Sequence, residues 1–203
     1  MEQPFEKLFA EELADIYDAE QQILKALPKM IRASSSPELQ EALEQHRIMT
    51  EGQVRRLDQI FSELGERPKK KCKGMAGLIA EGEETMEEDL EPEVKDAALI
   101  GAAQKVEHYE IAAYGTARTF AAFLGNETAV DLLEQTLEEE KEADILLTQI
   151  AESQVNVEAA AEEGEEEAGE ETRGTGRKRT TTGRPRTGTG GTRSRKGGSR
   201  SAR

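Results

Sequence analysis

The sequence predicts an all-α fold, an antiparallel four-helix bundle with a long crossover that carries a short extra helix. Residues with high helix propensity dominate the chain, whereas aromatic residues make up only 4% of it and Trp is absent. Apolar side chains recur at alternating intervals of three and four along four long segments. The 203 residues, 35% of them apolar, suffice for one modest core rather than two large domains.

The first predicted helix covers residues 6–32 and the second covers residues 37–64. Ser36 is expected to cap the second helix, with Pro37 at its first position and Gly65 just after its end. The face of the first helix comprises Leu13, Ile16, Tyr17, Glu20, Leu24, Leu27 and Ile31. The face of the second comprises Leu39, Leu43, His46, Thr50, Gln53, Leu57, Ile60 and Leu64.

A basic connector and a short amphipathic helix around residues 75–90 follow, and two more long helices come after them. The third long helix starts near Pro92, and Gly125-Asn126 separates it from the fourth, at residues 127–155. Their faces comprise Leu99, Ala103, Val106, Glu110, Ala113, Ala117, Phe120 and Leu124, and then Val130, Leu133, Leu137, Glu140, Asp144, Leu147 and Ala151. Two helix pairs joined by a long connector are the layout of ferritin-like folds.

Charge divides the chain into three parts. Residues 1–157, the predicted bundle, carry 34 acidic and 16 basic side chains, a net charge of −18. Residues 158–172 form an acidic linker with 8 acidic side chains and no basic one, and residues 173–203 carry 11 basic side chains and no acidic one. Both of these segments lack large apolar residues, so we expect them to be disordered.

The basic tail is a candidate nucleic-acid contact. Flexible Arg-rich segments bind polyanions by releasing counterions, and Gly183-Arg184-Pro185-Arg186 resembles the core of an AT-hook, which lies in a narrow minor groove. Nonspecific DNA or RNA contact is favoured over A·T preference. The residues expected to carry it are Arg177, Lys178, Arg179, Arg184 and Arg186. The alternative is that the tail folds back on the acidic body of the same chain.

Several protein classes are excluded by composition. No segment approaches the roughly 20 apolar residues of a membrane helix, and no secretory leader opens the chain. Cys72 is the only cysteine, which excludes an intrachain disulfide framework and a cysteine-based zinc site. We therefore expect a cytoplasmic protein without membrane contact.

Polar residues interrupt the apolar faces of all four long helices. They are Glu20, His46, Glu110, Glu140 and Asp144, and Glu107 lies one turn before Glu110. Singly, each is typical of a half-buried position at a bundle end. As a set they favour a metal site, because burying unpaired carboxylates costs several kcal/mol and no Arg or Lys is expected at their level. Carboxylates with a histidine suit iron or manganese.

Several motifs in these helices resemble those of a known protein family. They are Tyr17-Asp18-Ala19-Glu20-Gln21-Gln22, the segment 72–78, Asp96-Ala97-Ala98-Leu99-Ile100, the run 103–112 (AQKVEHYEIA) and Leu137-Glu138-Glu139-Glu140-Lys141. Over residues 5–157 the chain resembles the bacterial ferritin-like YciE/YciF stress-protein family. The resemblance implies a ferritin-like bundle, a homodimer and an iron-type metal site, dinuclear or degenerate.

One position departs from the family pattern. The resemblance implies a Glu three residues after His46, where this chain has Met49, a soft thioether ligand that suits iron and manganese poorly. Glu51 points off that face. We therefore expect low metal occupancy, altered geometry or no binding. His108 is expected at the surface or in a dimer contact, and Tyr17, beside Glu20, is the tyrosine considered for redox activity.

Two classes of function remain. The first is a metal-binding stress protein, with iron-dependent oxidase or peroxide-consuming activity as its expected chemistry. The second is a non-catalytic module, nucleoid-associated or structural, whose metal site is vestigial. A bundle that binds iron and is tethered to DNA by its tail would combine the two.

Overall fold

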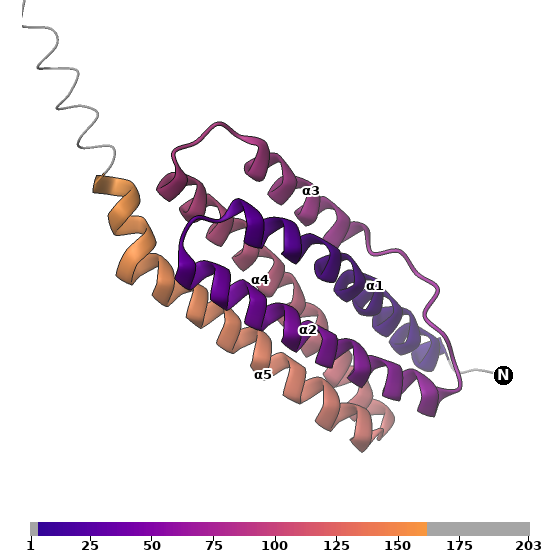
Figure 1. Ribbon diagram of the computed structural model, residues 1–203. Helices are drawn as coiled ribbons and strands as arrows, with labels where there is room; N and C mark the ends of the chain where they lie inside the picture. The colour runs from indigo at the N-terminus through magenta and orange to yellow at the C-terminus, as the bar shows by residue number, and fades with distance from the viewer. Residues whose placement is uncertain (1–3, 162–203) are drawn as a thin grey trace, which may run out of the picture.

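The computed structural model describes residues 4–161 (Figure 1). The described range contains α-helices and no β-strand, which confirms the all-α prediction. The helices are α1 (Pro4–Ala33), α2 (Pro37–Leu64), α3 (Lys73–Glu87), α4 (Pro92–Leu124) and α5 (Glu127–Ile150), followed by a π-helical turn, η1 (Ala151–Val155). Within that range, no helix combines the length and the apolar character that a membrane crossing requires.

Local capping interactions set the helix boundaries close to the expected positions. Ser36 Oγ accepts a hydrogen bond from the Leu39 amide at 3.2 Å, and Asn126 caps α5 in the same way. Gly65 and Gly125 adopt φ values of 69° and 72°, the left-handed conformation that ends α2 and α4. The predicted N-cap and C-cap residues are therefore confirmed.

The two long hairpins are joined by a crossover that runs the length of the bundle. In Figure 1, α1 is antiparallel to α2, α4 is antiparallel to α5, and α3 lies along the outer side of α1. Ion pairs hold the crossover to α1, from Lys71 to Asp18 at 2.7 Å and from Lys29 to Glu83 at 2.5 Å. Because the crossover returns the chain to the opposite end, α2 and α4 run parallel, as the ferritin-like layout requires.

The core consists of two apolar halves separated by a polar layer. One half includes Phe9, Leu13, Ile16, Leu57, Ile60, Tyr114 and Leu133. The other includes Ile23, Leu27, Leu39, Leu43, Met75, Leu99, Ile100 and Leu147. Six of the buried polar residues lie between these halves along the long helices: Glu20, His46, Gln53, Glu107, Glu110 and Glu140. The middle of the bundle is therefore polar although it is closed to solvent.

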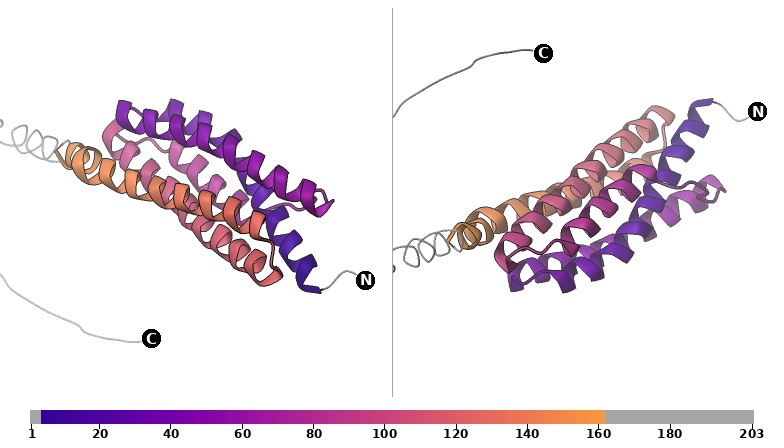
Figure 2. Two further views of the ribbon diagram at one scale, coloured as in Figure 1. Left: turned by 90° about the horizontal axis from the view of Figure 1, so that it is seen from below. Right: turned by 90° about the horizontal axis from the view of Figure 1, so that it is seen from above.

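The C-terminal helix extends further than expected. Helical backbone continues after η1 to residue 161, past the expected bundle end at residue 157 and into the acidic linker. Figure 2 shows this end of the chain projecting beyond the other helices. Ala159, Ala160 and Ala161 have the highest helix propensity, so the helix continues without a core to cover it. The rest of the predicted linker and the whole predicted tail lie outside the described residues.

Candidate metal centre

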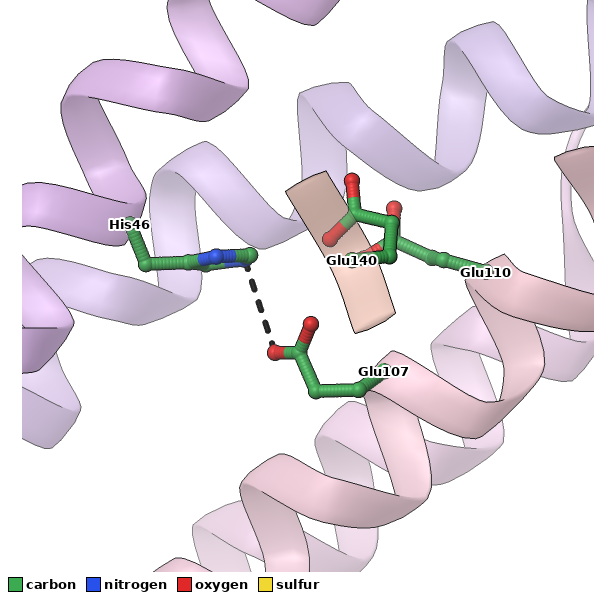
Figure 3. Close-up of side chains that lie close together, drawn as sticks. All are labelled: His46, Glu107, Glu110 and Glu140. Carbon is green, nitrogen blue, oxygen red and sulfur yellow. Dashed lines mark ion pairs between the residues drawn. The ribbon is translucent and has the colours of Figure 1, made fainter. Parts of the chain in front are cut away.

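His46, Glu107, Glu110 and Glu140 converge in the polar layer and form the candidate metal centre (Figure 3). Each offers one ligand atom, and these atoms all lie within 4.8 Å of one another. Every one of these residues is at most 6% exposed. His46 comes from α2, Glu107 and Glu110 from α4, and Glu140 from α5, so three helices meet at one depth in the bundle.

Glu20 brings the fourth helix to the same place. It is fully buried on α1, close enough to Glu110 and Glu140 for charge repulsion among these carboxylates to raise their pKa values. Tyr114 donates its hydroxyl proton to Glu20 Oε1, and Gln53 Nε2 donates to Glu140 Oε1 at 2.5 Å. These two contacts tie α1 to α4 and α2 to α5 at the level of the site.

Most of the converging polar atoms have no donor to balance them. Within the described part of the chain, no amide, hydroxyl or cationic donor reaches either carboxylate oxygen of Glu110, nor Oε2 of Glu20, Glu107 and Glu140. Neither ring nitrogen of His46 makes a hydrogen bond there. A buried polar atom without a partner costs about 1–3 kcal/mol. A cation bound among these atoms would satisfy them together.

Burial also changes the protonation of these groups. It raises the pKa of Glu107 to about 8, and it raises the pKa values of Glu20, Glu110 and Glu140 well above their usual range, with repulsion from neighbouring carboxylates adding to the effect. Burial lowers the pKa of His46 to about 4. At neutral pH the imidazole is thus neutral, which leaves a ring nitrogen free to bind a metal.

The protonation states of His46 and Glu107 determine how strongly these two side chains attract each other. His46 Nε2 lies 3.5 Å from Glu107 Oε1, drawn as a dashed line in Figure 3. Because the imidazole is neutral and Glu107 is largely protonated at pH 7, the pair gains little attraction of opposite charges. A bound metal would instead release the carboxyl protons and use both side chains as ligands.

The donor set fits iron or manganese. Carboxylates and imidazole are the ligands of the carboxylate-bridged sites found in ferritin-like bundles. Met49 lies beside the site as expected, since it lines a cavity of about 30 Å³ together with His46 and Glu107. Glu51 is exposed and paired with Arg47 at 2.6 Å, so it does not replace the missing carboxylate.

Asp144, like Glu20, is not among the four predicted ligands whose ligand atoms converge. It is half-buried, accepts a hydrogen bond from Gln104 at 3.1 Å and lies 3.4 Å from Nε2 of His108. Its carboxylate therefore faces the surface beside His108, the residue that follows Glu107, and not the buried carboxylates. His108 is at the surface as expected, with its side chain 69% exposed.

The tyrosine beside Glu20 differs from the expected one. Tyr17 packs edge-on against Phe61, with ring centroids 6.0 Å apart, and the tyrosine that contacts Glu20 is Tyr114. Its position four residues after Glu110 places it on the same helix face, a signal available in the sequence.

A guanidinium group also lies near the site, contrary to expectation. Arg56 is mostly buried, and its charge opposes the rise in the pKa values of Glu20 and Glu140. Its own ion pair with Glu139 and its hydrogen bond to Thr136 already occupy it, so it does not balance the whole cluster. The expected nucleic-acid residues Arg177, Lys178, Arg179, Arg184 and Arg186 lie outside the described residues.

Known proteins share both the sequence and this architecture. The family described as a domain of unknown function, DUF892, matches residues 4–160. YciF of Escherichia coli K12 is 49% identical over 156 residues, which are 76% of this chain and 94% of that protein. The crystal structure of the E. coli stress protein YciF superimposes with a TM-score of 0.73 at 48% identity, covering 76% of this chain and 99% of that one.

Two further solved structures are similar to this chain in fold. YcfI of Rhodopseudomonas palustris, described as a candidate structural protein, has a TM-score of 0.71 at 45% identity and covers 73% of this chain and 96% of its own. A protein of Xanthomonas campestris at 21% identity shares the fold, with a TM-score of 0.65 over 78% of this chain and 97% of its own. The chain therefore belongs to the DUF892 family, with the E. coli stress protein YciF among its relatives.

Proposed function

We propose that this YciF-like protein binds iron, or manganese, in the polar layer of its bundle as part of a bacterial stress response. The observation that carries the proposal is the convergence of His46, Glu107, Glu110 and Glu140, buried and mostly without donors. Ionised together in a dry core, these carboxylates would repel one another, and a divalent cation removes that repulsion.

Iron bound in this position would supply electrons to an oxidant such as dioxygen or peroxide. The protein's own contribution is to exclude water, to hold His46 neutral and to keep the carboxyl groups aligned from four helices. Tyr114 and Gln53 orient Glu20 and Glu140 by donating to one oxygen of each, which leaves the second oxygen for the metal. With Met49 in place of a carboxylate, we expect weaker binding than a full ferritin-like site gives.

The test is metal loading of the full chain. Metal-stripped protein is incubated with Fe(II) under anaerobic conditions, desalted, analysed for metal and then exposed to air while its absorbance is followed. We expect about one ion or more per chain, and a ferric absorbance change after air is admitted.

Two substitutions separate site binding from surface binding. Glu110→Gln removes a buried carboxylate at similar volume, and Glu142→Gln removes an exposed one on α5. We expect the first to abolish loading and the second to leave it unchanged. Loading far below one ion per chain in the unmodified protein, or equal loading in both variants, would refute the proposal.

The second candidate is a structural module, favoured by the description of YcfI. In that case the polar layer is a vestigial site, and the proposed DNA contact through the tail is the activity. Replacing Arg177, Lys178, Arg179, Arg184 and Arg186 by Gln in the full chain tests the tail. Salt-sensitive retention on DNA that is lost in this variant supports tethering, and unchanged retention excludes it.

We also propose that the chain forms a homodimer. Ile48 on α2 and Ile145 on α5 are 54% and 55% exposed. Contacts between Gln53 and Glu140 and between Gln154 and Glu38 set an antiparallel register that places these two isoleucines level with each other. Light scattering should give the mass of a dimer, and replacing both isoleucines by Ser should give a monomer.

A further inference from the structure

A small, mostly apolar cavity lies between the crossover helix α3 and two residues of the metal centre. It has a volume of about 40 Å³ and lies among α1, α2, α3 and α4. Its walls include Leu27, Ile79, Gly82 and Val106, and its buried end is formed by His46 and Glu107. Glu83, 43% exposed and paired with Lys29, lies at the outer rim.

The size and lining of this cavity restrict what can occupy it. A volume of about 40 Å³ exceeds the roughly 10–15 Å³ that one water molecule needs, but it is far below the 150 Å³ of a cavity that holds benzene. Water in a cavity needs two to four polar partners. Here the lining is apolar except for His46, Glu83 and Glu107, so a small apolar molecule gives up fewer hydrogen bonds on entering than water does.

We propose that this cavity admits dioxygen to the metal centre. The proposal rests on the proposed function, since it names the oxidant that the same site would use and the path by which it arrives. Dioxygen is apolar and diatomic, matching the hydrocarbon walls and the volume, and the cavity ends on two of the residues that would hold the metal. Hydrogen peroxide, which needs hydrogen-bond partners along its path, would not use this route.

Two glycines of α3 provide a matched pair of variants. A Cβ atom on Gly82 would lie 3.8 Å from Ala102 Cβ and 3.9 Å from Met30 Cε, both on the cavity wall, so Gly82→Ala fills the cavity without a clash. A Cβ atom on Gly77 would meet nothing within 4 Å. Both substitutions raise helix propensity equally, and only the first changes the cavity.

Xenon is a small apolar atom, and its binding to the metal-free full chain tests whether the cavity accepts an apolar guest. We expect xenon to bind the unmodified protein and Gly77→Ala alike by ¹²⁹Xe NMR, and to bind Gly82→Ala about fivefold more weakly. Thermal unfolding of both variants verifies that they fold. Absence of xenon binding, or equal affinity in all three proteins, would overturn the proposal whether or not iron binds.

Oxidation kinetics then identify the oxidant. Two Fe(II) ions each lose one electron, and dioxygen gains two electrons and two protons to become hydrogen peroxide. In anaerobically loaded protein we expect Gly82→Ala to slow oxidation by dioxygen about fivefold relative to Gly77→Ala, with oxidation by added hydrogen peroxide unchanged. Equal slowing with both oxidants, or with neither, contradicts the proposed route, whereas failure to load iron contradicts the proposed function instead.

Discussion

The polar layer should make the metal-free protein less stable as the pH rises above neutrality. The pKa of Glu107 is about 8 in the folded protein and about 4.5 in the unfolded chain. The folded state therefore holds a proton that the unfolded state has released, and this stabilisation, complete below pH 4.5, is lost as the pH rises toward 8. The opposite holds for His46, whose lowered pKa makes the folded state less stable below pH 6.5.

Between pH 6.5 and 8, titration of the buried carboxyl groups dominates the change in the free energy of unfolding. Across this range, linkage predicts that Glu107 alone lowers the free energy of unfolding by about 1–2 kcal/mol, and the loss of the His46 penalty offsets only a small part of this change. The raised pKa values of Glu20, Glu110 and Glu140 act in the same direction. The net loss is at least about 1 kcal/mol, or about 2–4 °C in melting temperature for a domain of this size.

Denaturant unfolding of the full chain in EDTA, at several pH values, measures this slope. Glu107→Gln should flatten it, because the amide does not titrate, while Glu142→Gln, exposed on α5, should leave it unchanged. Saturating Mn(II) should reverse the slope, since metal binding needs ionised carboxylates and is favoured at higher pH. A stability that is flat or increases with pH in the metal-free protein would show that these carboxyl groups are not held protonated, and would refute the reasoning.

Three further predictions concern single side chains. Met49→Glu supplies a carboxylate beside His46 and should tighten Mn(II) binding about tenfold or more by calorimetry; the same affinity as in Met49→Gln would show that the missing charge is not the cause of weak binding. Tyr114→Phe removes the donor to Glu20 and should lower the stability of the metal-free fold by about 1–3 kcal/mol in denaturant unfolding; unchanged stability would show that this hydrogen bond does not stabilise the fold. Asp96 accepts from the amides of Ser35 and Ser36 at 2.9 and 2.6 Å. Asp96→Ala should therefore cost about 1.5–3 kcal/mol, and a cost no greater than that of Asp96→Asn would argue against this role.

Helix boundaries and the members of the polar layer were readable from the sequence because both depend on local spacing. Ser36-Pro37, Gly65 and Gly125-Asn126 end or begin helices through hydrogen bonds within four residues. Glu107 and Glu110 share a face because they are three residues apart. The same periodicity predicted that Glu20, His46 and Glu140 would face the core, and the structure confirms that they are buried.

Residues whose role depends on how one helix is placed against another were predicted less well. Asp144 is outside the group of converging residues because its carboxylate turns toward the exposed His108 instead of the buried carboxylates. Arg56 reaches toward the layer from a position off the predicted face of α2, which its long side chain allows. Tyr114 rather than Tyr17 contacts Glu20 because the pairing of α1 with α4 decides which ring lies opposite that carboxylate.

Taken by itself, the sequence determined the helices, their order, the long crossover and the acidic residues that turn inward, since a helix of 3.6 residues per turn fixes which side chains share a face. Only the tertiary structure decided which of those acidic groups lie at one level of the bundle and that the Arg56 side chain lies near them. It also decided that a cavity lined by α3 extends to two of the residues of the metal centre. Those properties depend on the axial register and the rotation of helices far apart in the chain. A shift of one turn, about 5.4 Å, exchanges one set of neighbours for another without altering any local pattern.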